Sequence, residues 1–228
     1  DDVRRFLRGD DNSVTAFVER LCGSPDIYHY HHADPEKSIN FVTCHDGFTL
    51  WDWASYNSKH NEANGEENRD GCDHNFSWNH GHEGVTEDPQ INALRMRQAK
   101  NMMVATLLSV GSPMLLMGDE LLRTQRGNNN GYCQDNATCW MNWLPNARSQ
   151  EMFRFMKELI QYRKHLFQRP EQESMPLSLT EILRHSEICW HGVNAGQPDF
   201  SPHSHAIAMS ALSSETKLAL YVLFNAYW

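Results

Sequence analysis

INFVTCHDGFTL, residues 39–50, is the stretch that decides the fold of this chain. Its first part, Ile39–Thr43, has the apolar character of a short strand that is enclosed on both faces. A polar elbow with His45, Asp46 and Gly47 follows at once. A histidine and a carboxylate at the C-terminal mouth of a parallel strand stand where α/β barrels place their chemistry. The stretch therefore predicts a site that is built around Asp46.

A second strand of the same kind is expected at Pro113–Met117, and it is followed by the residues Gly-Asp-Glu at 118–120. Apolar residues at three-to-four spacing predict helices at Ile91–Val110 and at Met152–Phe167. The order strand, loop, helix, strand, loop, helix is the βα repeat of a parallel barrel or a doubly wound sheet. For Glu120 we favour a structural role, as a helix cap or in an ion pair.

Long polar loops follow both expected strands, at 57–89 and 126–136. A loop of such length inside a compact domain is unusual unless it is functional or disordered. Amides and carboxylates bind vicinal hydroxyl groups, and an indole face packs on the C–H face of a sugar. The composition of these loops therefore favours a polyhydroxylated substrate over a solvated linker.

A metal site is the weaker interpretation of the histidines in these loops. The candidates fall in two groups that lie far apart in the sequence: His29, His31 and His32, then His80, His82 and Glu83. Zinc requires ligands that converge closely, usually at fixed short spacings. We interpret these histidines as solvated or substrate-facing loop residues.

Composition restricts the classes of partner. The 228 residues carry a formal net charge of -9 without a basic run, which argues against nucleic acid and anionic membranes as partners. The six cysteines have no CxxC spacing, so free thiols in a reducing compartment are expected. No apolar run reaches the length of a membrane span.

The pattern of apolar and turn residues changes at about Arg169. Three short runs with turn residues between them predict an antiparallel β domain, at 187–190, 206–212 and 218–224. We therefore expect one domain at 1–168 and a second at 169–228. The chain begins without methionine and stops within an apolar run, and we interpret both ends as cuts in a longer protein.

Five blocks of sequence together resemble the isoamylase and glycogen-debranching branch of the α-amylase superfamily of glycoside hydrolases. They occur in the same order as in that family and extend over almost the whole chain: FVTCHDGFTL (41–50), HNEANGEENRDG (60–71), GSPMLLMGDE (111–120), GNNNGYCQDN (127–136) and WHGVNAGQPDFSPHSHA (190–206). The HD pair alone would be weak evidence, but five collinear blocks are specific.

The resemblance implies a (β/α)8 barrel followed by a β-sandwich, with Ile39–Thr43 as barrel strand 7 and Pro113–Met117 as strand 8. It implies retaining hydrolysis of α-1,6 branch linkages in glycogen, amylopectin or their dextrins. Asp46 matches the carboxylate that stabilises the transition state, and His45 matches the adjacent substrate-binding histidine. Further substrate contacts are expected from the two polar loops, through Asn61, Glu62, Asn129 and Asn130.

The motifs that carry the nucleophile and the acid/base in this family are absent from the chain. A retaining mechanism needs those two carboxyl groups roughly 5 Å apart. We therefore expect the chain to be inactive alone, and its unpaired sheet edges predict that it is poorly soluble or molten. No cofactor is expected. Calcium occurs in some members of the family, but no ligand set can be named here. The family implies a bacterial cytoplasmic location or the plastid stroma.

Four other functions remain open. The elbow at 39–50 is shared across the superfamily, so an α-1,4-acting amylase or a transglycosylase fits it equally. The block at 60–71 favours debranching. From another class, a non-catalytic α-glucan-binding protein on a barrel without its first carboxylates is also compatible. A metal-dependent hydrolase is the weakest option.

Overall fold

A computed structural model describes residues 1–28, 37–166, 186–213 and 219–227 of the chain. The chain divides into two compact units. Unit one contains residues 1, 41–104 and 114–158, and unit two contains residues 2–40, 105–113 and 159–228. The expected domain boundary at 168/169 lies outside the described residues and stays a prediction. None of the described helices is long and apolar enough to cross a membrane.

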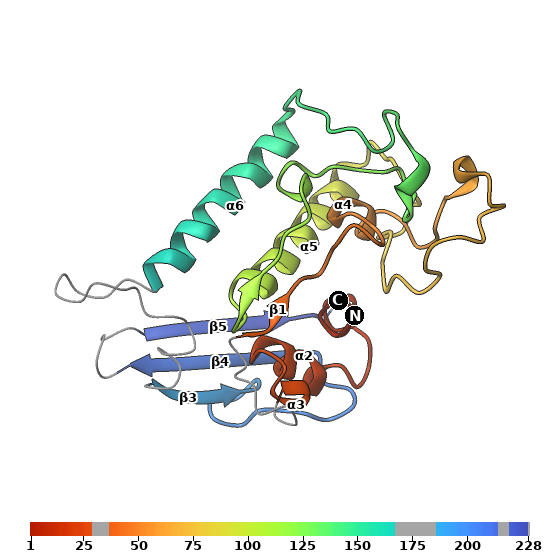
Figure 1. Ribbon diagram of the computed structural model, residues 1–228. Coiled ribbons are helices and arrows are strands. Elements are labelled where there is room, and N and C mark those ends of the chain that lie inside the picture. The colour runs from red at the N-terminus through yellow and green to blue at the C-terminus, as the bar shows by residue number, and fades with distance from the viewer. Residues whose placement is uncertain (29–36, 167–185, 214–218, 228) are drawn as a thin grey trace. The chain divides into compact units, whose positions relative to one another are not determined.

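Figure 1 shows the helices and strands and labels those for which there is room. In chain order they are α1 (Asp2–Arg8), α2 (Val14–Leu21), α3 (Pro25–Tyr28), β1 (Ile39–Asn40), α4 (Leu50–Trp53), η3 (Glu62–Asn64), α5 (Pro89–Leu107), β2 (Ser112–Pro113), η4 (Asp119–Leu121), η5 (Gly131–Cys133), α6 (Ala147–Leu166), β3 (Ser186–His191), β4 (Ala206–Ser213) and β5 (Ala219–Asn225). The structure is thus a mixture of helices and strands.

Both long helices begin earlier than the apolar pattern predicts, because capping residues set their first turns. The Asp88 carboxylate accepts hydrogen bonds from the backbone N–H groups of Gln90 (2.8 Å) and Ile91 (3.3 Å), so α5 begins at Pro89. Asn146 and Ser149 bond reciprocally at the start of α6, as in a capping box. The last residue of the expected helix at 152–167 lies outside the described residues.

The two short strands β1 and β2 pair in parallel, with Ile39 opposite Ser112. This parallel pairing was expected, but each strand is only two residues long, and their predicted bounds of 39–43 and 113–117 are wrong. Enclosure on both faces is also wrong, since Ile39 is 61% exposed and Met117 is 74% exposed. The physical reason is that, within the described residues, neither strand has a neighbour on its second side.

Unit one is built on a core of aromatic, methionine and aliphatic side chains. The fully buried members include Phe48, Leu50 and Trp53 from the segment after the elbow, with Met102 and Met103 from α5. The Trp53 indole also donates a 2.7 Å hydrogen bond to the carbonyl of Phe76. The long polar loop is therefore attached to the core at Phe76, past its midpoint.

Unit two contains the antiparallel sheet β3-β4-β5 (Figure 1). This confirms the antiparallel strands that were expected from the C-terminal sequence. Phe17 of α2 stacks on Phe6 of α1 at 4.0 Å between ring centroids, and it meets the edge of Phe224 of β5 at 4.9 Å. The aromatic cluster joins the N-terminal helices to the sheet within this unit.

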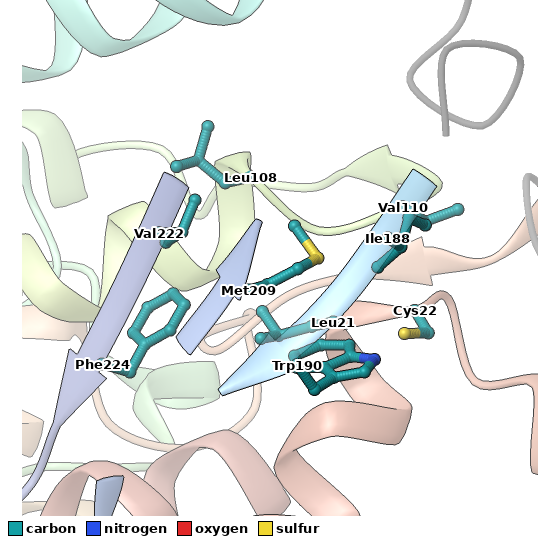
Figure 2. A pocket seen from close by; sticks show the side chains of 9 residues that line it. All are labelled: Leu21, Cys22, Leu108, Val110, Ile188, Trp190, Met209, Val222 and Phe224. Atoms are coloured by element: carbon teal, nitrogen blue, oxygen red, sulfur yellow. The ribbon is translucent and has the colours of Figure 1, made fainter. Parts of the chain in front are cut away.

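An apolar cavity of about 220 Å³ lies in unit two (Figure 2). Trp190, Met209 and Phe224 line it from the sheet, and Leu21 and Cys22 line it from the end of α2. Burial raises the pKa of the Cys22 thiol to about 11, so the thiol stays protonated at neutral pH. Such a lining offers little to the hydroxyl groups of a sugar, and the candidate site lies elsewhere.

Candidate active site

The elbow in unit one presents two polar side chains to solvent. Side-chain exposure is 88% for His45 and 80% for Asp46, and the imidazole Nε2 lies 3.4 Å from the carboxylate Oδ2. Gly47 follows with φ +103°, a conformation that other residues rarely adopt. The chain therefore bends at Gly47, directly behind Asp46, and the carboxylate of Asp46 stays accessible to solvent.

Asp119 joins the two ends of this elbow. Its Oδ1 accepts a 3.0 Å hydrogen bond from the N–H of Leu50, and its Oδ2 accepts one from the hydroxyl of Thr43. The side chain is buried, and burial raises the pKa of the carboxyl to about 6 although both hydrogen bonds lower it. The loop that follows β2 thus supports the elbow.

Glu120, beside Asp119, has a local role. Its carboxylate accepts a 2.9 Å hydrogen bond from the backbone N–H of Gly118, two residues earlier. This contact within the turn agrees with the structural role that the sequence favoured.

Asp52 makes a second connection between the same segments. It is fully buried on α4 and accepts hydrogen bonds from the Thr124 hydroxyl and, at 2.7 Å, from the Gln125 N–H. Burial raises the pKa of its carboxyl to about 6, against the opposing effect of these hydrogen bonds. Sequence reasoning missed this residue. The spacing Thr49-x-x-Asp52, typical of a capped first helical turn, was the available signal.

The middle of the elbow is held by the loop at 126–136. The N–H of Gly47 donates a 2.9 Å hydrogen bond to the carbonyl of Asn129. The Asn129 N–H donates to the Asn61 side-chain oxygen at 2.9 Å, and the Asn61 amide donates back to the Asn129 side chain at 2.8 Å. Asn61 is 0% and Asn129 is 1% exposed, so in this structure both side chains hold the two loops together.

The other two predicted binding residues lie nearer the surface. The Asn130 amide donates a 2.9 Å hydrogen bond to Asp70, and Asn64 donates to the same carboxylate oxygen at 2.7 Å. The hydrogen bond from Asn64, which has the larger effect, and the one from Asn130 hold the pKa of Asp70 below its usual value. Glu62 is exposed in η3. The structure therefore brings Asn61, Asn129 and Asn130 into one cluster and leaves Glu62 on its rim.

A buried arginine that the sequence did not single out organises the end of the long loop. Arg95 of α5 is 1% exposed, and its guanidinium donates to backbone carbonyls of that loop, including Gly84 (2.6 Å) and Asn79 (2.9 Å). Its position on the otherwise apolar face of a predicted helix was the signal.

The interpretation of the loop histidines as solvated or substrate-facing is wrong for His80, which is only 6% exposed because its ring packs inside the loop. The His80 ring contacts the Ala54 carbonyl at 2.9 Å, and the Glu83 carboxylate accepts backbone N–H groups of Asn57 (2.8 Å) and Ser58 (3.1 Å). Across the part of the chain that the structure describes, His, Cys, Asp and Glu side chains form no group of three or more that could hold a metal ion. His29, His31 and His32 lie outside the described residues.

Solved structures identify the class of fold. A pullulanase from Anoxybacillus sp. LM18-11 in complex with maltotetraose matches 97% of this chain and 26% of its own, with a TM-score of 0.62 at 22% identity. An apo pullulanase from Paenibacillus barengoltzii matches 100% of this chain and 31% of its own, with a TM-score of 0.60 at 22% identity. The chain therefore has the fold of a segment of the pullulanases.

Sequence relatives identify the family. "Isoamylase SU1, chloroplastic" from Zea mays is 42% identical over 226 residues, which are 99% of this chain and 28% of the relative. The "Glycogen debranching enzyme" of Pectobacterium carotovorum is 51% identical over 164 residues, which are 72% of this chain and 25% of the relative. No family model matches the chain. The chain is thus homologous to one segment of the isoamylases and glycogen debranching enzymes, and it spans only about a quarter of their length.

Proposed function

We propose that this chain is the C-terminal portion of a debranching glycoside hydrolase that cleaves α-1,6 branch linkages of glycogen or starch. In this proposal, residues 1–168 supply strands 7 and 8 of a (β/α)8 barrel with their helices, and residues 169–228 begin a β-sandwich. The homology to isoamylases and glycogen debranching enzymes supports the reaction class. Within the chain itself, the proposal is supported by the exposed Asp46 carboxylate, which lies on an elbow that a hydrogen bond from Leu50 to Asp119 holds in place.

Asp46 would stabilise the positive charge that develops on the sugar ring in an oxocarbenium-like transition state. A carboxylate that is 80% exposed in the chain can approach a substrate without rearrangement of its own loop. His45, 3.4 Å away, would bind a hydroxyl group of the same sugar. Glu62 and Asn130 are the further contacts proposed from the polar loops, whereas Asn61 and Asn129 would act by holding those loops.

The nucleophile and the acid/base belong to other residues of the complete protein in this proposal. A retaining glycosidase needs both, and Asp46 takes neither role. The 228-residue chain is accordingly proposed to be inactive alone. The substrate would be a branched α-glucan, and the complete protein would work in a bacterial cytoplasm or in the plastid stroma, as the chloroplastic isoamylases suggest.

The test measures reducing-end release from glycogen limit dextrin and from pullulan. The 228-residue chain and the complete protein that contains it are compared, each with the variant Asp46→Asn. We expect release by the complete protein only, with a loss of ~10²–10³-fold in Asp46→Asn, on the scale of losing one preorganised electrostatic contact. Glu87→Gln, which neutralises another exposed carboxylate of unit one, is the matched control.

Three results would refute parts of the proposal. Release by the chain alone that disappears in Asp46→Asn would place a complete site within these residues. Products that retain all α-1,6 linkages would indicate an α-1,4-acting enzyme. Binding of glucan without release by the complete protein would indicate a non-catalytic binding protein.

A further inference from the structure

A single buried carboxylate closes the loop that carries Asp46. Thr43 and Leu50, the residues on either side of the elbow, both donate hydrogen bonds to Asp119. These contacts join residues that are 76 and 69 positions apart in the sequence. Asp119 is 1% exposed, so water does not compete for either hydrogen bond.

The turn that carries Asp119 is itself tightly closed. Gly118 has φ +99°, and a Cβ at this position would lie 2.8 Å from the Arg123 side chain. The Arg123 N–H donates to the Gly118 carbonyl at 2.9 Å, and the Arg123 guanidinium donates to the Cys139 carbonyl at 3.3 Å. The carboxylate of Asp119 is therefore presented from a backbone with few alternative conformations.

The Asp46 side chain, by contrast, depends on the backbone for its position. It is 80% exposed, so packing does not fix its direction. Residues outside the elbow hold the backbone around it at three points: at Thr43, at Leu50, and at Gly47 through the Asn129 carbonyl. Asp119 accounts for two of these three points.

We propose that Asp119 is a positioning residue, which sets the place and direction of the Asp46 carboxylate by closing both ends of the elbow. The inference rests on the function proposed above, because it gives Asp46 its role in the reaction. A displacement of about 1 Å at a reacting centre can cost ~10²-fold in rate, so loss of the closure is expected to lower kcat.

Two substitutions separate the hydrogen bonds from the charge. In Asp119→Asn the amide oxygen still accepts from the Leu50 N–H, and the amide NH₂ donates to the Thr43 hydroxyl. In Asp119→Leu the shape of the side chain is similar but both hydrogen bonds are lost. If Asp119 acts by positioning the elbow, Asp119→Asn should keep the kcat that Asp119→Leu loses.

The first measurement is kcat and KM of the complete enzyme on pullulan. We expect Asp119→Leu to lower kcat by ~10²-fold with KM within about threefold, and Asp119→Asn to keep kcat within about fivefold of the wild type. Met103→Ala, at a fully buried core position of unit one, is the control for general destabilisation. It should lower the melting temperature comparably and leave kcat within about twofold, whereas a leucine variant with the kcat of this control would overturn the inference.

The second measurement does not depend on activity. Amide hydrogen exchange of the peptide at 44–49 should be at least ~10-fold faster in Asp119→Leu than in the wild type and unchanged in Met103→Ala. Equal exchange in all three proteins would overturn the inference. If wild type and Asp46→Asn show equal activity, the proposed function fails, and the exchange rates still decide whether Asp119 positions the elbow.

Discussion

Neutralising Asp52 should change how the stability of the protein depends on pH. This carboxyl is completely buried on α4, and burial raises its pKa from the usual 3.8 to about 6. In the substitution Asp52→Asn the amide oxygen accepts from the Gln125 N–H, and the amide NH₂ donates to the Thr124 hydroxyl. The substitution therefore removes the titration and keeps the hydrogen bonds to Thr124 and Gln125 that join α4 to the loop.

The direction of the effect follows from proton linkage. Below the unfolded-state pKa of 3.8 the group is protonated in both states, and its contribution to stability is fully present. Between pH 3.8 and about pH 6 the group has lost its proton in the unfolded chain but keeps it in the folded protein. Its contribution to stability therefore falls as the pH rises, and it is lost once the pH has risen through the folded-state pKa of about 6. A difference of about two pKa units at ~1.4 kcal/mol per unit corresponds to about 3 kcal/mol.

The assay is urea unfolding of the complete protein and of Asp52→Asn from pH 4 to pH 7. The free energy of unfolding of the wild type minus that of the variant should fall by about 2 kcal/mol over this range, because at pH 4 the group in the unfolded chain has already lost about half of its proton. Thr124→Val is the control. It keeps the Asp52 carboxylate but removes a hydrogen bond that lowers the pKa of this group. The free energy of unfolding of Thr124→Val should therefore continue to fall to a higher pH than that of the wild type. A difference between wild type and Asp52→Asn that is constant with pH would refute the reasoning.

Three further predictions concern the elbow, the loops and the isolated chain. Gly47→Ala should cost about 1–3 kcal/mol of stability and lower kcat, because φ is +103° at this position. The cost comes from the backbone conformation, since an added Cβ would meet no described atom within 4 Å. Urea unfolding and steady-state kinetics measure the two effects, and unchanged values would contradict the prediction. Asn61→Ala should cost about 1–3 kcal/mol in urea unfolding, because the buried Asn129 N–H loses its acceptor; a cost below ~0.5 kcal/mol would count against it. The 228-residue chain alone should lack native near-UV circular dichroism, and a sharp cooperative melt would disprove this.

Local patterns in the sequence were sufficient for several features of the fold. The apolar spacing predicted α5 and α6 to within a few residues at each described end, and the alternation of apolar runs with turn residues predicted the antiparallel strands β3, β4 and β5. Helix periodicity and turn residues depend on residues only a few positions apart, so the sequence alone is enough to predict these elements. The capping contacts at Asp88 and Asn146 explain why the helices begin earlier than the apolar pattern alone indicated.

The predicted binding residues Asn61 and Asn129 make contacts that the sequence alone does not indicate. Asn61 and Asn129 are predicted substrate contacts because amides can bind the vicinal hydroxyl groups of a sugar. In the structure they bond to each other across 68 positions of sequence and are buried. An amide has the same donors and acceptors for a sugar hydroxyl as for another amide, so its chemistry does not reveal its partner.

The sequence by itself determined the order of the elements, the elbow with His45 and Asp46, and the homology to debranching enzymes. Only the tertiary structure decided that Asp52 and Asp119 are buried and that they join the elbow and α4 to the loop after β2. The physical reason is that burial and hydrogen-bond partners depend on residues some seventy positions away, which are brought together by packing and not by local preference.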